Sequence, residues 1–500
     1  MEPMTTCLPV PKSYRFDTEP LQLEAGATIC LEPDGKHPQT MQLATQALGR
    51  YLGLPVQVRD PKPGDYPIRV QIVSATPGES SDTIAVDLTD TRSQSYRISL
   101  TKHGGVVRAA SGAAAIYACA ALGQLIKEKP NSTIEITTGE VSDQPRFAWR
   151  GFSMDIARNF YGLTELTTLL DLMASYRMNV LHLHLSDDQG WRLELDCYPG
   201  LAQISGVTSM AGGRSGYLTK SDYAQLQELA AARGIVVIPE IDIPGHVNAI
   251  QHALGELTPQ GEPLASYGGS KVGFSKLYPQ LPATWKFLQE VFSELAAQTT
   301  GPYIHVGGDE AMESTPEEYQ KIVQFAVKTV HDAGKLSVGW QEAAKADLDS
   351  NTIIQYWNMN ENTAYVAQAA QRGAKLIMSP ANRIYLDMKE TRAQHIGVDW
   401  AGVTPLEQSY DWDPATAIGG ITEENVQGVE AALWTEKVAH WQTASLLLLP
   451  RLLAAAEVAW SPQESRDFAR FSTALPAQYD WWARLNLPHT PQPPIRQPGN

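Results

Sequence analysis

The sequence predicts an α/β protein in which a small α+β domain precedes a (β/α)8 TIM barrel. Eight short, apolar, strand-like runs alternate with helical stretches from about residue 150 onward, which is the count of such a barrel. A carboxylate or a tryptophan follows nearly every run. The competing fold is a doubly wound open sheet. That fold normally carries a glycine-rich phosphate-binding turn after an early strand, and this sequence has none.

The first third of the chain has a different pattern. A helical stretch is expected at 39–52, and two strand-like segments at 96–101 and 106–109 flank His103-Gly-Gly, which predicts a hairpin. An alanine-rich helix is expected at 112–127, because Pro130 stops it. We therefore expect residues 1–143 to form a compact α+β domain that serves as a scaffold.

After a polar break at 142–145 we expect the barrel, residues 144–500, with a short C-terminal tail. Its strands are expected at 151–157, 180–185, 235–241, 303–306, 336–340, 353–357, 374–378 and 428–434. Helices are expected at 163–177, 221–232, 284–297, 316–333 and 441–459. In such a barrel the catalytic groups lie at the C-terminal ends of the strands.

The residues that follow these strands share one chemistry, since most are acids or aromatic residues. In chain order they are Asp155 with Arg158, Asp187 with Asp188, Asp242 with His246, Asp309 with Glu310, Trp340, Trp357, Tyr385 with Asp387, and Trp434 with Glu436. Indole rings stack on the apolar faces of a pyranose, and carboxylates accept its hydroxyl protons. The strand ends therefore predict a sugar-binding pocket.

Asp309 and Glu310 are adjacent at the end of Tyr-Ile-His-Val-Gly-Gly, where the glycines allow a tight turn out of the core. Neighbouring acids repel each other, which favours one proton donor and one fixed anion. A solvated acidic loop is the plainer alternative. The acids that follow the other strands favour catalysis.

Several residues also have plain structural explanations. Trp340 and Trp357 could cap the barrel core, Arg158 could pair with Asp155, and His246 could be a turn histidine. His182 and His184 share one face of a strand, which could suggest a metal. A catalytic zinc site needs a third protein ligand, so we expect these histidines to bind other polar side chains, and we expect no metal and no cofactor.

Composition narrows the choice of partners. The 500 residues carry a formal charge of −16 and a pI near 5.2, which disfavours a nucleic-acid or anionic-membrane surface. No apolar run is long enough to span a bilayer, and the prolines before residue 16 interrupt any signal peptide. The four scattered cysteines read as reduced thiols. We expect a cytoplasmic location, or a periplasmic or secreted one if the natural start was removed.

From about residue 147 to 460 the chain resembles the family 20 glycoside hydrolases, the β-N-acetylhexosaminidases, and the first third resembles the small domain that precedes their barrel. The matching stretches, in order, are Asp-Ile-Ala-Arg158, His-Leu-His-Leu-Ser-Asp-Asp-Gln-Gly-Trp191, Pro-Glu-Ile-Asp-Ile-Pro-Gly-His246, His-Val-Gly-Gly-Asp-Glu310, Gly-Trp340, Gln-Tyr-Trp357, Tyr-Leu-Asp387 and Leu-Trp-Thr-Glu436. One departure is Asn159, where the family often has histidine.

The resemblance implies an exo-acting, retaining enzyme that removes terminal N-acetylglucosamine or N-acetylgalactosamine by substrate-assisted catalysis. It implies that Glu310 is the general acid and base, and that the 2-acetamido oxygen of the substrate is the nucleophile, giving an oxazolinium intermediate. Asp309 would orient the acetamido nitrogen, and the Tyr385 hydroxyl would hold its carbonyl oxygen.

The resemblance also assigns the sugar-binding residues. Arg158, Asp387 and Glu436 would hold the ring hydroxyls, and Trp340, Trp357 and Trp434 would form the walls. Asp187 and His246 are expected in the substrate site beneath the acid pair, with Asp242 behind them. Strand alternation would turn Asp188 inward rather than Asp187, so the resemblance requires a change of strand geometry there.

Two alternatives stay open: a conventional retaining glycosidase whose nucleophile is Asp309 or Asp187, and a sugar-binding barrel without turnover. The sequence does not decide between the two sugars or the oligomeric state. Trp400 and Trp412 could line a leaving-group subsite or pack their loop, and we expect packing for both.

Overall fold

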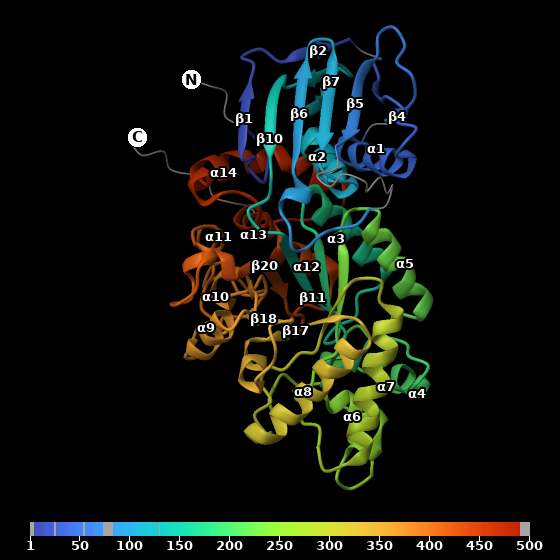
Figure 1. Cartoon of the computed structure of the whole chain (residues 1–500), viewed down its shortest axis with the longest axis vertical. Coiled ribbons are helices and arrows are strands. Elements are labelled where there is room, and N and C mark those ends of the chain that lie inside the picture. Colours follow the sequence, from blue (N-terminus) through green and yellow to red (C-terminus); the bar gives the residue numbers. More distant parts are fainter. Residues whose placement is uncertain (1–4, 25–26, 54–55, 74–83, 130, 491–500) are drawn as a thin grey trace.

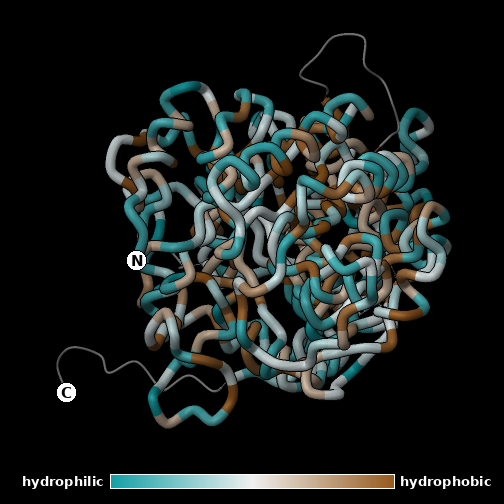
Figure 2. The backbone as a smooth tube through the Cα atoms, turned by 90° about the horizontal axis from the view of Figure 1, so that it is seen from below, coloured by the Kyte–Doolittle hydropathy of each residue, from teal (hydrophilic) through white to brown (hydrophobic). Residues whose placement is uncertain are grey.

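The computed structural model describes residues 5–24, 27–53, 56–73, 84–129 and 131–490. The chain forms two domains in sequence, an N-terminal domain built on an open sheet and a closed barrel. The N-terminal domain lies above the barrel in Figure 1. Figure 2 shows hydrophilic segments along much of the outline and hydrophobic ones mostly within it. The arrangement confirms the predicted fold class.

The N-terminal domain is built on a seven-stranded sheet in the order β1-β10-β6-β7-β5-β3-β4. These strands are β1 Ser13–Phe16, β3 Ile29–Leu31, β4 Gln57–Val58, β5 Tyr66–Ile72, β6 Tyr96–Thr101, β7 Gly104–Ala109 and β10 Gly139–Asp143. The predicted hairpin is β6 with β7. A smaller sheet joins β2 Leu21–Leu23, β8 Ile126–Glu128 and β9 Ile134–Ile136.

Two helices, α1 Pro38–Leu52 and α2 Gly112–Gln124, form the apolar core of this domain with the sheet. The Ser111 side chain caps the start of α2 by accepting a hydrogen bond from the Ala114 N–H. The predicted extension of this helix to Lys127 is wrong. The chain turns after Leu125 so that β8 can pair with β9, and strand pairing outweighs helix propensity there.

All eight predicted barrel strands are present, and they close in sequence order. They are β11 Trp149–Asp155, β12 Val180–His184, β15 Val236–Glu240, β16 Tyr303–His305, β17 Leu336–Trp340, β18 Thr352–Tyr356, β19 Leu376–Met378 and β20 Val426–Leu433. Adjacent barrel strands pair in parallel. Their C-terminal ends therefore meet at one rim.

Helices surround the barrel. They include α3 Leu163–Ser175, α4 Pro199–Ser205, α5 Lys220–Ala231, α6 Asn248–Ala253, α7 Pro282–Gln298, α8 Pro316–Asp332, α9 Ala364–Gln371, α10 Ala381–Ile384, α11 Leu406–Tyr410, α12 Trp441–Leu448 and α13 Arg451–Trp460. Between β17 and β18 a 3₁₀ turn, Gln341–Ala346, takes the place of a helix. The single helix predicted at 441–459 is wrong, because Pro450 divides it into α12 and α13.

The end of the chain joins the two domains. After α13, the helices α14 Phe468–Ala474 and α15 Tyr479–Arg484 pack beside the N-terminal domain, as Figure 1 shows for α14. The Trp460 side chain lies in the core of that domain, where the guanidinium carbons of Arg150 and Arg177 lie 4.8 and 4.6 Å from its ring centroid. This contact ties the barrel to the sheet above it.

Within the described part of the chain, no single helix is long and apolar enough to cross a membrane. Only the bent pair α12 and α13, taken together, reaches that length and composition.

Candidate active site

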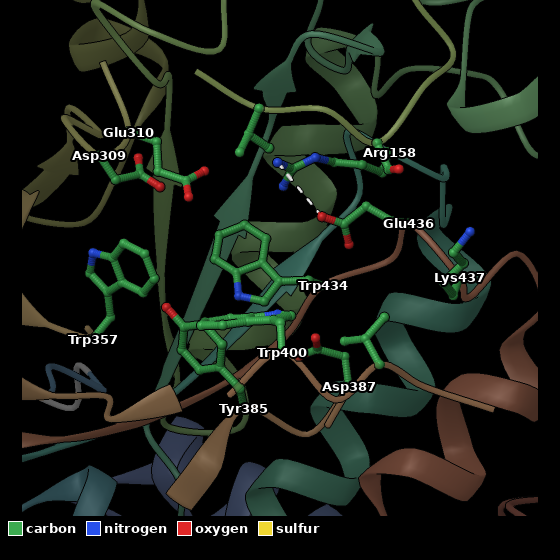
Figure 3. Close-up of a pocket in the computed structure, with 13 residues that line it drawn as sticks. Arg158, Asp309, Glu310, Trp357, Tyr385, Asp387, Trp400, Trp434, Glu436 and Lys437 are labelled. Atoms are coloured by element: carbon green, nitrogen blue, oxygen red, sulfur yellow. Dashed lines mark ion pairs between the residues drawn. The ribbon is translucent and has the colours of Figure 1, made fainter. Parts of the chain in front are cut away.

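A pocket of about 310 Å³ opens where the barrel strands end (Figure 3). Its lining residues are Arg158, Ser270, Val272, Asp309, Glu310, Trp357, Tyr385, Asp387, Val398, Trp400, Trp434, Glu436 and Lys437. Eight of the twelve predicted site residues are in this lining, and Asp187, Asp242, His246 and Trp340 are not. Those four are buried side chains that lie around the pocket, and their contacts are described below.

The turn that carries the acid pair depends on glycine. After β16 the backbone has φ angles of +70° at Gly307, +110° at Gly308 and +47° at Glu310. A Cβ atom on Gly307 would lie 1.8 Å from Asp242 Oδ1, an oxygen that accepts a hydrogen bond from the Gly308 N–H at 2.9 Å. Strained backbone of this kind costs roughly 1–3 kcal/mol per residue and tends to cluster at functional sites. The turn brings both carboxyl groups to the pocket.

His246 lies against both acids. Its Nε2 is 3.5 Å from Glu310 Oε2 and 3.8 Å from Asp309 Oδ2, and its Nδ1 is 3.2 Å from Asp187 Oδ1. Burial alone would lower the pKa of His246, but the charges of Asp187 and Asp309 outweigh it and raise that pKa well above its usual value. A positive imidazolium therefore faces the acid pair.

Two of the acids near His246, Asp242 and Asp309, have raised pKa values. Burial and then the charge of Asp309 raise the pKa of Asp242 well above its usual range. Burial also raises the pKa of Asp309, while His246 opposes that rise. The Glu310 side chain is more exposed than that of Asp309, at 25% against 13%. The adjacent acids thus have distinct environments.

Asp187 joins the acid pair to the opposite side of the pocket. Its Oδ2 lies 2.7 Å from Arg158 Nη2 and 2.8 Å from His184 Nε2. Burial opposes ionisation of Asp187, but Arg158 and His246 outweigh it and lower its pKa. The carboxylate is therefore held by three cationic side chains.

The structure has the change of strand geometry that the resemblance required at Asp187 and Asp188. β13 Ser186–Asp187 leaves the barrel and pairs with β14 Gly190–Trp191 in a short hairpin. The Asp188 carboxylate instead accepts hydrogen bonds from the Asn248 N–H and the Ser275 hydroxyl.

Asn159, which stands where the family often has histidine, lies after the first barrel strand. Its side-chain amide donates to the Thr435 carbonyl oxygen at 2.7 Å.

Arg158, Asp387 and Glu436 form the polar side of the pocket in Figure 3. Arg158 Nη2 is 3.9 Å from Glu436 Oε1, and Arg158 Nη1 is 3.6 Å from Asp155 Oδ2. Several buried atoms have no hydrogen-bond partner among the described residues, namely Arg158 Nε and Nη1, Asp387 Oδ1 and Asp309 Oδ1. Buried polar atoms are costly when unpaired, so this arrangement suits a ligand rich in hydroxyl and amide groups.

The aromatic side of the pocket is made by Trp357, Tyr385 and Trp434. The rings of Trp357 and Tyr385 are parallel, with centroids 6.3 Å apart, and the Tyr385 ring lies 5.9 Å from that of Trp434. Trp340 lies behind Trp434 at 5.8 Å and is 1% exposed. Burial raises the pKa of Tyr385 well above its usual value, with Asp309 adding to the effect, so its hydroxyl stays protonated and can donate.

The packing predicted for two tryptophans has a mixed outcome. Trp412 is buried, and its indole N–H donates to the Ser409 carbonyl oxygen. Trp400 is 52% exposed and lines the pocket, where its ring stands at 74° to the ring of Trp357 and at 76° to that of Tyr385. The packing prediction is therefore wrong for Trp400.

Sequence reasoning also missed several residues near the pocket. Ser270, Val272, Val398 and Lys437 lie in loops whose course no periodic pattern reveals. Glu342, two residues after Trp340, accepts a hydrogen bond from Trp357 Nε1 at 3.1 Å. Burial, aided by Asp309, raises the pKa of Glu342 to about 8. The acid in the Gly-Trp-Gln-Glu stretch that ends β17 was the available signal.

Some buried acids and histidines lie close enough to share an ion by distance alone, including His182 with Glu240 and His305, and Asp242 with His246 and Asp309. His182 already pairs with Glu430 and Glu240, and His184 with Glu240 and Asp187. These histidines therefore bind the polar side chains that the sequence led us to expect.

Two family profiles cover most of the chain. The catalytic domain of glycosyl hydrolase family 20 matches residues 147–463, and domain 2 of the same family matches residues 4–144. The chain belongs to glycosyl hydrolase family 20. The resemblance seen in the sequence is thereby confirmed.

Similar proteins support this membership over nearly the full length. A β-N-acetylhexosaminidase of Cellulomonas fimi is 41% identical over 484 residues, which cover 97% of this chain and 95% of that protein. The human β-hexosaminidase subunit β is 29% identical over 75% of this chain and 67% of its own length. The solved family 20 β-N-acetylhexosaminidase of Streptomyces coelicolor A3(2) superimposes with a TM-score of 0.89 at 33% identity, covering 99% of both chains.

Proposed function

We propose that the chain removes terminal, non-reducing N-acetylglucosamine or N-acetylgalactosamine residues with retained configuration, using Glu310, Asp309 and Tyr385. Family membership makes it an exo-acting β-N-acetylhexosaminidase that works by substrate-assisted catalysis. The assignment of residues rests on one observation: two adjacent acids share a pocket with a tyrosine hydroxyl, and an imidazolium lies behind the acids.

In the first step Glu310 donates its proton to the glycosidic oxygen. The carbonyl oxygen of the substrate's 2-acetamido group attacks C1 as the bond to the leaving group breaks. Asp309 accepts the amide N–H and offsets the positive charge of the oxazolinium ring, while the Tyr385 hydroxyl donates to the acetamido oxygen. An internal nucleophile held in place gives a large effective molarity, so no enzyme nucleophile is needed.

In the second step the Glu310 carboxylate takes a proton from water as the water oxygen attacks C1 and the ring of the intermediate opens. Two inversions at C1 give net retention. Arg158, Asp387 and Glu436 hold the ring hydroxyls, which satisfies the unpartnered atoms found there. Trp357 and Trp434 enclose the sugar, with Trp340 behind them.

The substrate is a glycoside or small oligosaccharide that contains such a terminal sugar. A solved mutant β-hexosaminidase from Streptomyces plicatus, to which this chain is similar, is in complex with N-acetylglucosamine as its product, which supports this choice. The proposal covers both sugars, which differ only in the orientation of the C4 hydroxyl. A cytoplasmic location stays a prediction, which fractionation of cells producing the protein would test.

The test is hydrolysis of two chromogenic substrates that differ only at C2. We expect release of the chromophore from the N-acetylglucosaminide and little from the glucoside, which lacks the 2-acetamido nucleophile. Comparable cleavage of both, or a trapped covalent adduct on Asp309 or Asp187, would favour a conventional retaining mechanism. Binding of N-acetylglucosamine without any turnover would favour a sugar-binding protein.

A further inference from the structure

Glu240 is a fully buried carboxylate at the end of β15, beneath the pocket and outside its lining. Its Oε1 accepts a hydrogen bond from Trp340 Nε1 at 2.7 Å. Its Oε2 lies 2.5 Å from His184 Nδ1 and 3.1 Å from His182 Nε2. A buried charge with this many partners is held in one position, and it holds its partners in turn.

His184 connects Glu240 to the site. Its Nδ1 faces Glu240, and its Nε2 lies 2.8 Å from Asp187 Oδ2. An ionised carboxylate can accept hydrogen bonds but cannot donate one. Since each ring nitrogen of His184 faces such a carboxylate, both nitrogens must carry protons. Burial opposes this charge, but Glu240 and Asp187 outweigh it and raise the pKa of His184 well above its usual value.

Asp187, which contacts His184, also contacts two residues of the site, Arg158 and His246. Its Oδ2 holds Arg158, which faces the sugar hydroxyls, and its Oδ1 holds His246, which lies against the acid pair. A second route runs through aromatic rings: Glu240 holds Trp340, whose ring packs on Trp434. The Arg158 guanidinium lies 5.1 Å from the ring of Trp434, so both routes end at Arg158.

We infer that Glu240 is a positioning residue for the hydrolysis, acting through His184 and Trp340 on the side chains that hold the sugar and the acid pair. The inference rests on the function proposed above. Without the carboxylate, His184 has no second anion to retain its extra proton and donates to one partner only. Asp187 then loses a charged partner, and the alignment of Arg158 and His246 relaxes.

Glu430 on β20 provides a matched control. It is also a fully buried glutamate inside the barrel, and its three partners are His182 Nδ1 at 2.8 Å, Gln355 Nε2 at 2.9 Å and Trp149 Nε1 at 2.8 Å. Glu240 has one neighbour more, His305 Nδ1 at 3.1 Å from Oε1. None of the three partners of Glu430 lines the pocket or contacts Asp187, and only His182 is shared with Glu240, at 3.1 Å from its Oε2. Removing its charge should therefore disturb the barrel core as much as removing that of Glu240, with less effect on the site.

The experiment compares wild type, Glu240→Gln and Glu430→Gln with the chromogenic N-acetylglucosaminide, and measures Tm and the affinity for a thiazoline mimic of the intermediate. Small misplacements of catalytic groups cost up to about 100-fold. We expect Glu240→Gln to lose about 10- to 100-fold in kcat/KM and a similar factor in thiazoline affinity. Glu430→Gln should lose less than about threefold, at a similar fall in Tm.

Equal kinetic losses in the two variants, or wild-type kinetics in Glu240→Gln, would overturn the inference while wild type stays active. An inactive wild type would overturn the proposed function and this inference with it. If Glu240→Gln does not fold, ¹⁵N NMR of histidine-labelled wild type gives the answer. Two protonated ring nitrogens on His184 at pH 7 support the inference, and one protonated nitrogen overturns it.

Discussion

The imidazole of His246 lies between Asp187 and Glu310, with Nδ1 3.2 Å from Asp187 Oδ1 and Nε2 3.5 Å from Glu310 Oε2. This places a cation behind the proposed catalytic acid on one side and a fixed anion behind the cation. Because the same Asp187 also holds Arg158, the side chains proposed for proton transfer and for sugar binding share one support.

Glu310→Gln removes the proposed proton donor and keeps the volume of the side chain. We expect kcat/KM with an unactivated leaving group to fall about 10²- to 10⁴-fold, the contribution of a positioned acid or base. The measurement is steady-state hydrolysis, with Tm as the control for folding. Activity within about threefold of wild type would remove Glu310 from its role.

Tyr385→Phe removes only a hydroxyl group. In the proposed mechanism the hydroxyl donates to the acetamido oxygen as that atom becomes the nucleophile, so we expect kcat to fall by about 10², as when one preorganised donor is lost. Binding of N-acetylglucosamine should weaken far less. A change confined to KM would show that Tyr385 only binds the sugar.

Trp400→Ala tests whether this half-exposed ring contacts the leaving group. Ring stacking is worth about 0.5–1.5 kcal/mol, so kcat/KM for a β-linked N-acetylglucosamine disaccharide should fall about three- to tenfold. Hydrolysis of the N-acetylglucosaminyl fluoride, whose leaving group is a single atom, should stay within twofold. Equal losses with both substrates would mean that Trp400 shapes the sugar pocket instead.

Gly307→Ala places a Cβ atom where Asp242 Oδ1 now lies, in a backbone with φ of +70°. The turn must shift, and we expect a loss of roughly 1–3 kcal/mol in unfolding free energy together with most of the activity. Urea unfolding and steady-state kinetics measure the two effects. Gly334→Ala is the control, since it also has positive φ, at +77°, but open space around it. It should lose stability and keep activity.

The stability of the protein should depend on His182 above neutral pH. Burial lowers the pKa of His182, but Glu430 and Glu240 outweigh it and raise that pKa to about 9, against 6.5 for the unfolded chain. The folded state binds this proton more tightly, so the stabilisation is complete below about pH 6.5 and is lost as pH rises to 9. Its size is about 3 kcal/mol. Urea unfolding at pH 6.5, 8 and 9 should show this fall in wild type, and an equal fall in His182→Gln would contradict the assignment.

The barrel could be predicted because buried parallel strands are continuous apolar runs that alternate with helices. Each strand lies within about two residues of its prediction. Two helix predictions were wrong where a stronger constraint outweighed a local helical pattern. At the C-terminal end of α2 the constraint is the pairing of β8, Ile126–Glu128, with β9, and after α12 it is Pro450. The prediction for Trp400 was wrong because a loop has no periodic pattern. Without one, the sequence does not show whether a side chain packs within the loop or points toward the pocket.

The sequence by itself determined the acid pair, the strand-end residues that line the pocket and the family. These features are carried by short motifs at strand ends, and a parallel barrel brings all strand ends to one rim. Only the tertiary structure decided which of Asp187 and Asp188 turns toward the site, and that Glu240, His184 and Asp187 form a connected series of charges beneath it. Such contacts depend on which buried carboxylate meets which imidazole across the barrel, and residues far apart in the chain give no local pattern for that pairing.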